Sequence, residues 1–373
     1  MGGLVLWRVE EHEPVTERAW DPVRALDAIR AIVADAEAAE HDGAWPGHPL
    51  DDMAEDELAA SLYLGGAGMI WGLARVGTSL DVRAAVASAL ARYRAAPDEG
   101  ANAHVPSLFV GESGLLVVAD WLGSPAADRR RLSELVRANR EHPTWELLWG
   151  SPGTILAARA CGLEAEWRDS AELLYARWDE SSDMWTHEIG GRVQSSLGPI
   201  HGFAGNVHAL RGFVEEDILR ARVTRLLTRT AAREDGLANW PPTLESRASS
   251  IRVQWCHGAP GIVATVADLM PLELALAGGE LTWRAGPPRK GPGLCHGTAG
   301  NGFAFLKLHD LTGDARWLER ARRFAMHAID QVQTQRAQLG RGRYTLMTGD
   351  IGVALYLRGC IDEVAEFPIL NEL

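Results

Sequence analysis

The sequence is poor in cysteine and has no long apolar run. Only four of its 373 residues are cysteine, too few for a disulfide framework in a chain of this size. We therefore expect reduced thiols and a cytoplasmic location. No stretch of about 20 uninterrupted apolar residues occurs, so we expect no membrane span. The first residues also lack the basic and apolar regions of a signal peptide.

Positive charge is scarce as well. The formal net charge is −13, and Lys290 and Lys307 are the only lysines. This balance argues against nucleic acid as a partner. The apolar content of 46 % and the charged content of 23 % are ordinary for a globular protein. A chain of this length can bury a large core, and we expect a single domain over residues 1–373.

The sequence does contain, seven times, the pattern Gly-x-x-Gly followed by apolar residues. The first glycines of the seven pairs are Gly65, Gly111, Gly150, Gly202, Gly258, Gly297 and Gly349. Recurrence at intervals of about 40–55 residues indicates a repeat architecture. The segment after each pair is apolar nearly all round, which predicts a buried helix. The segments between them are amphipathic and charged.

The stretch that follows Asp314 is the clearest amphipathic segment. Asp314 can cap a helix there, and Trp317, Ala321 and Phe324 would share one face of it. Alternation of polar-sided and apolar helices over seven units predicts an all-α fold. We expect an α/α toroid of seven inner and seven outer helices, with little sheet because no convincing period-2 segment occurs.

Two of the glycine pairs directly follow a Cys-His dipeptide, Cys256-His257 before Gly258 and Cys295-His296 before Gly297. Thiolate sulfur and imidazole nitrogen suit zinc. Loops before the inner helices of a toroid meet at one end, so these neighbouring repeats predict one zinc site there. Either all four Cys and His residues close a structural site, or three bind the ion and a fourth position takes substrate. We favour the second, because a large toroid needs no metal staple.

These strings carry a resemblance to a known family. Residues 255–261 (Trp-Cys-His-Gly-Ala-Pro-Gly) and 293–301, together with the seven glycine pairs, resemble the lanthionine synthetase C-like (LanC-like) family over about residues 50–360. The match is weakest in the N-terminal segment 1–50. The resemblance implies an α/α toroid with one Zn²⁺ bound by Cys256, Cys295 and His296. It also implies thiol addition to dehydroalanine or dehydrobutyrine, a reaction that suits a zinc-activated thiolate.

Two further strings resemble family motifs and nominate catalytic residues. His201, in His-Gly-Phe-Ala-Gly, matches the acid/base candidate of the family, and Glu146 lies where eukaryotic-type members carry Glu and ring-forming cyclases tend to carry Asp. We expect His201 to protonate the α-carbon and Glu146 either to orient His201 or to assist deprotonation of the thiol. The plain alternatives are a backbone-bonded histidine and a solvent-exposed acid. Glu146 and His257 place the chain nearer the eukaryotic-type, glutathione-binding members.

Lys290, in a Gly/Pro-rich basic loop, matches a lysine of those eukaryotic-type members. It would bring positive charge to an acidic thiol such as glutathione, or simply lie in an exposed loop. The implied partners are a dehydrated peptide or protein, a thiol that is either glutathione or a peptide cysteine, and a separate dehydratase, kinase or lyase that makes the acceptor. Two rival functions stay open: a non-catalytic zinc-dependent protein that binds glutathione or peptide, and a carbohydrate-active toroid. The second needs paired carboxylates, and Glu146 lacks a convincing partner.

Overall fold

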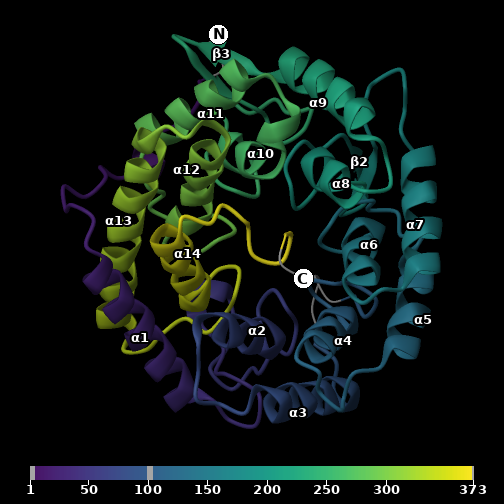
Figure 1. Ribbon diagram of the computed structural model, residues 1–373, viewed down its shortest axis with the longest axis vertical. Coiled ribbons are helices and arrows are strands. Elements are labelled where there is room, and N and C mark those ends of the chain that lie inside the picture. The colour runs from purple at the N-terminus through teal and green to yellow at the C-terminus, as the bar shows by residue number, and fades with distance from the viewer. Residues whose placement is uncertain (1–4, 99–103, 372–373) are drawn as a thin grey trace.

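Fourteen α-helices in two concentric rings form the fold of the computed structural model, which describes residues 5–98 and 104–371 (Figure 1). The inner ring consists of α2 (Gly66–Val76), α4 (Glu112–Trp121), α6 (Ser151–Ala160), α8 (Phe203–Ala209), α10 (Ala259–Val266), α12 (Thr298–Thr312) and α14 (Asp350–Asp362). The outer ring consists of α1 (Pro22–Ala39), α3 (Val82–Ala95), α5 (Arg129–Asn139), α7 (Glu164–Ala176), α9 (Glu216–Thr230), α11 (Leu272–Ala285) and α13 (Ala315–Leu339).

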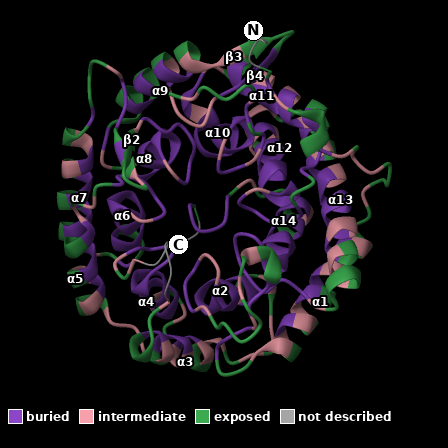
Figure 2. Cartoon of the chain, turned by 180° about the vertical axis from the view of Figure 1, so that it is seen from behind, coloured by how far each residue is buried: buried purple, intermediate pink, exposed green. Residues whose placement is uncertain are grey.

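The inner helices form a closed ring. Each contacts the next in chain order, and α14 contacts α2. Outer helix α1 packs against α13 and α14 and so covers the seam between the two ends of the chain. The inner helices are buried nearly throughout, whereas the outer helices expose their outward faces (Figure 2). The predicted α/α toroid with seven inner and seven outer helices is confirmed.

Regular structure outside the rings is short. Three 3₁₀ turns, η1 (Val9–Glu11), η2 (Pro49–Asp51) and η3 (Ala267–Leu269), and four strands, β1 (His187–Ile189), β2 (Arg192–Gln194), β3 (Ala232–Glu234) and β4 (Leu237–Asn239), complete the elements of the described residues. The strands pair antiparallel as β1–β2 and β3–β4. The expectation of little sheet is therefore met. None of the described helices combines the length and apolarity needed to cross a membrane.

Glycine pairs set the starts of the inner helices. The first glycine of every pair is the N-cap residue of an inner helix. The second is needed because the preceding loop folds back over the first helical turn. A Cβ at Gly261 or at Gly300 would lie 1.7 Å from the backbone oxygen of Trp255 or Leu294. Gly258 also has φ +102, which favours glycine.

The amphipathic outer helices also begin and pack as the sequence predicts. Asp314 caps α13 by accepting a hydrogen bond from the backbone N–H of Arg316. Trp317, Ala321 and Phe324 are fully buried on the inward face of that helix. The tertiary role of these helices is to bury the outward side of the apolar inner ring, which accounts for most of the stabilisation available to such a fold.

A collar of backbone hydrogen bonds joins the loops that precede the inner helices. Cys256 N–H donates to the carbonyl oxygen of Cys295 (3.0 Å), and Cys295 N–H donates to Met347 (2.7 Å). Met347 N–H donates to Tyr63 (3.3 Å), and Tyr63 N–H donates to Phe109 (2.8 Å). All five residues lie two positions before the first glycine of their repeat. The collar therefore gathers equivalent positions of the repeats at one end of the toroid.

The C-terminal segment, residues 364–371, follows the end of α14 that points away from the collar and lies inside the ring (Figure 1). Phe367 stacks face to face on Trp255, with ring centroids 4.2 Å apart and 4° between the ring planes. His208 donates a hydrogen bond of 2.9 Å from Nε2 to the carbonyl oxygen of Leu370. The segment thus connects the far mouth of the toroid with the residue that precedes Cys256.

Candidate metal centre

Cys256, Cys295 and His296 form one group of potential metal ligands at the collar. Their ligand atoms all lie within 4.8 Å of one another, and Cys256 Sγ is 3.9 Å from Nδ1 of His296. Both thiols are buried, and His296 is half-buried. Two sulfurs and one imidazole nitrogen at this separation fit three corners of a zinc tetrahedron, whose Zn–S and Zn–N bonds are about 2.0–2.3 Å. The three residues therefore fit Zn²⁺ and leave a fourth position.

The surroundings of the two thiols favour one negative charge on the pair, carried by Cys256. Burial opposes ionisation of Cys256, but hydrogen bonds from Cys295 and His296 and the nearby imidazoles hold the pKa of Cys256 well below its usual value. Burial and the charge on Cys256 raise the pKa of Cys295 well above the usual value. A cation at this point would remove the repulsion between the two sulfurs, since a coordinating thiol is deprotonated outright.

His257 is not part of the ligand group among the described residues. Its ring instead stacks against that of His201, with centroids 5.9 Å apart and 25° between planes. Burial lowers the pKa of His257, so the neutral ring predominates near pH 7. The four-ligand structural alternative is therefore not supported, whereas the three-ligand arrangement fits.

Buried Glu146 and half-buried His201 form a hydrogen-bonded pair beside the ligands. The carboxylate accepts a hydrogen bond of 3.0 Å from Nδ1 of His201, and it also accepts from the backbone N–H groups of Leu148 (3.0 Å) and Trp149 (2.7 Å). The side chain of Glu146 is fully buried, so the alternative of a solvent-exposed acid is wrong. His201 bonds to a carboxylate, which also rules out its reading as a backbone-bonded histidine.

Each member of the Glu146–His201 pair shifts the pKa of the other. Burial alone would raise the pKa of Glu146, but its hydrogen bonds and the charge of His201 lower it. Burial alone would lower the pKa of His201, but the hydrogen bond to Glu146 and the charges of Glu146 and Cys256 raise it. Because Nδ1–H donates to the carboxylate, Nε2 is the nitrogen left to exchange a proton with a reactant. This arrangement can perform acid/base chemistry next to the ligand group.

Lys290 lies in an exposed loop that borders a cavity of about 320 Å³. The lining includes Glu11, His12, Arg252, Gln254, Arg289 and Lys290. Gln254 connects the cavity with the ligands, because its Nε2 donates a hydrogen bond of 2.9 Å to Cys256 Sγ. The cavity therefore presents three cationic side chains and the carboxylate of Glu11 beside Gln254.

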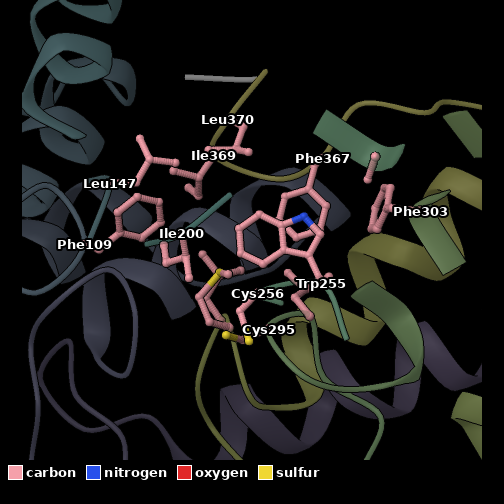
Figure 3. Close-up of a cluster of buried hydrophobic side chains, with 14 of the residues drawn as sticks. Phe109, Leu147, Ile200, Trp255, Cys256, Cys295, Phe303, Phe367, Ile369 and Leu370 are labelled. Carbon is pink, nitrogen blue, oxygen red and sulfur yellow. The ribbon is translucent and has the colours of Figure 1, made fainter. Parts of the chain in front are cut away.

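Behind the ligands the interior of the toroid is apolar and filled. Figure 3 shows the two cysteines below a cluster that contains Trp255, Ile200 and Phe367. These side chains are at most 2 % exposed. This apolar packing covers the side of the two cysteines that faces the interior of the toroid.

Two neighbours of the ligands were not predicted from the sequence, Gln254 and Tyr63. The phenol of Tyr63 lies beside Cys295, and burial and this sulfur raise the pKa of the phenol. A signal for Tyr63 does exist: it lies two residues before Gly65, the same offset at which Cys256 and Cys295 precede their glycines. No such offset marks Gln254, whose position depends on the fold of its own loop.

A ring of paired helices with a Cys₂His group at one mouth is an α/α toroid with a candidate metal site. The family model described as lanthionine synthetase C-like protein matches residues 56–370. The chain therefore belongs to the lanthionine synthetase C-like family. Nisin cyclase has the same fold, with a TM-score of 0.60 at 14 % identity, and the match covers 89 % of this chain and 93 % of that one.

Two curated relatives come from eukaryotes. Glutathione S-transferase LANCL1 of Danio rerio is 42 % identical over 85 residues, which are 21 % of this chain and 21 % of that protein. LanC-like protein GCL1 of Arabidopsis thaliana is 36 % identical over 140 residues, 35 % of this chain and 32 % of that protein. The aligned regions thus span a third or less of either relative. The predicted resemblance to the family, nearer its eukaryotic-type members, is confirmed.

Proposed function

We propose that this protein is a zinc-dependent enzyme that adds a thiol to dehydroalanine or dehydrobutyrine and forms a thioether. The observation that carries the proposal is the pair of buried Glu146 and half-buried His201 beside the group formed by Cys256, Cys295 and His296. A proton donor next to a three-ligand zinc site has the parts that conjugate addition requires. Zinc, when bound, supplies the acidity that converts an incoming thiol into a nucleophile near neutral pH.

Residues of the chain then supply the proton that the addition product requires. The thiolate forms a bond to the β-carbon, the carbon–carbon double bond opens, and the α-carbon must take up one proton. His201 delivers it from Nε2, and Glu146 holds the ring in orientation and stabilises its protonated form. The fully buried carboxylate exchanges no proton with solvent in this scheme, which is why we assign it a positioning role.

An acidic thiol of the glutathione type is the cosubstrate that the cavity favours. Arg252, Arg289 and Lys290 line it, and they can pair with carboxylates of such a thiol. The name of the Danio rerio relative, glutathione S-transferase LANCL1, supports this choice. The acceptor is then a dehydrated peptide or protein, which a separate dehydratase, kinase or lyase must supply. Attack by a cysteine within the same peptide, as a cyclase name implies, is the second candidate.

The test is thioether formation by the zinc-loaded full chain. A synthetic dehydroalanine peptide is incubated with and without glutathione, and products are identified by mass spectrometry. We expect a glutathione adduct that depends on the protein, and His201→Ala should retain one zinc per chain and lose turnover. Saturable binding of glutathione with no adduct would instead establish the non-catalytic binding protein. Normal turnover of His201→Ala would refute the assignment of the proton donor.

A further inference from the structure

Gln254 is held in a fixed position against a ligand sulfur. Its backbone N–H donates to the carbonyl oxygen of His257 (3.1 Å), and His257 N–H donates back to Gln254 (3.0 Å). This short closed loop presents Cys256 at its tip. From the base of the loop, Nε2 of Gln254 reaches Cys256 Sγ at 2.9 Å. The amide is therefore oriented by local backbone structure and requires no bound ligand to find the sulfur.

Tyr63 has the corresponding place at the other sulfur. Its phenol lies close enough to Cys295 that the sulfur, after burial, raises the pKa of the phenol. The backbone of Tyr63 is held in the collar, where its carbonyl oxygen accepts from Met347, whose own carbonyl accepts from Cys295. Each sulfur of the ligand group thus has a neutral side chain with a donor group beside it, and the two side chains come from different repeats.

In the proposed function, the electrophilic substrate could react with a ligand sulfur in place of the incoming thiol. An electrophilic alkene must approach a point where two ligand sulfurs lie together with a third, incoming sulfur. If Cys256 attacked the β-carbon, a thioether would form on the protein, the α-carbon would take a proton, and the ligand would be lost. Such an adduct inactivates the site permanently, because the thioether bond is stable.

We propose that Gln254 and Tyr63 act as positioning residues that lower the nucleophilicity of Cys256 and Cys295 by hydrogen bonding, so that the electrophile reacts with the incoming thiol. This inference rests on the proposed function. A hydrogen bond to an anionic sulfur withdraws electron density and must be broken or weakened before that sulfur can attack carbon. Hydrogen-bond partners outside the ligand set generally adjust the orientation and basicity of metal ligands.

The proposal is tested by measuring, in each variant, the alkylation rates of both cysteines, an experiment we call crossed alkylation. The zinc-loaded full chain is treated with iodoacetamide, where a sulfur–carbon bond forms, the carbon–iodine bond breaks and iodide leaves. Adducts on Cys256 and Cys295 are measured separately by mass spectrometry. We expect Gln254→Met to speed alkylation of Cys256 about tenfold and to leave the alkylation rate of Cys295 within twofold of wild type. We expect Tyr63→Phe to speed alkylation of Cys295 about tenfold and to leave the rate of Cys256 within twofold. Gln333→Met, an exposed glutamine on α13, should change neither rate.

A spectroscopic measurement separates this effect from loosened packing. In the Co²⁺-loaded chain, loss of a donor to one sulfur should move the sulfur-to-cobalt charge-transfer band to longer wavelength, with the metal still bound at one per chain. Gln254→Leu, which also lacks a donor, must behave like Gln254→Met. Equal alkylation rates in wild type and variants, or loss of the metal from both Gln254 variants, would overturn the proposal.

The reagent keeps this test independent of the proposed function. Iodoacetamide alkylates thiolates without a catalyst, so the crossed pattern can be observed even if the protein adds no thiol to a dehydroalanine peptide. Conversely, a protein that forms thioethers but shows no crossed pattern would retain its proposed function and lose this inference.

Discussion

Truncation of Phe367 to alanine measures how firmly the C-terminal segment is held inside the toroid. The ring is 1 % exposed. It lies face to face with Trp255 at 4.2 Å and packs edge-on against Phe303 with centroids 5.1 Å apart. Alanine would abolish both contacts and leave a space that the surrounding helices cannot easily fill, because they form a closed ring.

The expected loss follows from these contacts. Removal of a buried phenylalanine side chain costs about 3–5 kcal/mol, of which about 0.5–1.5 kcal/mol belongs to each aromatic pair. We therefore expect the free energy of unfolding to fall by about 3–5 kcal/mol in Phe367→Ala. Trp255 directly precedes Cys256, so we also expect weaker zinc retention against a chelator.

Urea unfolding followed by tryptophan fluorescence measures the first effect, and competition with a chromophoric chelator measures the second. The half-buried Phe213 provides a matched control, and Phe213→Ala should lose less than half as much stability. A loss below about 1 kcal/mol in Phe367→Ala would refute the reasoning, because the segment would then not be packed in the interior under solution conditions.

Three further predictions concern the charged groups. Glu146→Gln removes the charge that raises the pKa of His201, so we expect thiol addition to fall about 10- to 150-fold at unchanged zinc content; a rate within twofold of wild type would contradict the pairing. Burial lowers the pKa of His208 from 6.5 to about 4. The unfolded chain therefore takes up a proton that the folded one excludes, and stability should be full above pH 6.5 and fall by ~3 kcal/mol as the pH drops to 4. Urea titrations at several pH values check this, and an unchanged slope in His208→Gln would exclude His208 as its source. Lys290→Glu should weaken glutathione binding about tenfold by calorimetry, whereas Lys307→Glu, at the only other lysine, should not; equal effects would assign the loss to net charge alone.

The fold was largely predictable because its determinants are local. Seven glycine pairs mark seven N-caps, and the amphipathic pattern after Asp314 marks the buried face of an outer helix. Short-range sterics and hydrophobic periodicity decide such features within a few residues. The choice of Cys256, Cys295 and His296 as ligands came from their residue types and from resemblance to the family, and the structure brings them together.

The sequence by itself determined where the inner helices begin, which faces are apolar and which side chains can bind a soft cation. Only the tertiary structure decided which of the two histidines that follow the ligand cysteines, His257 or His296, joins the sulfurs, and that Glu146 lies buried against His201. It also decided that residues 364–371 enter the ring and that Tyr63 reaches Cys295. The physical reason is closure: a ring of helices brings together residues up to hundreds of positions apart, and no local spacing in the chain encodes those distances.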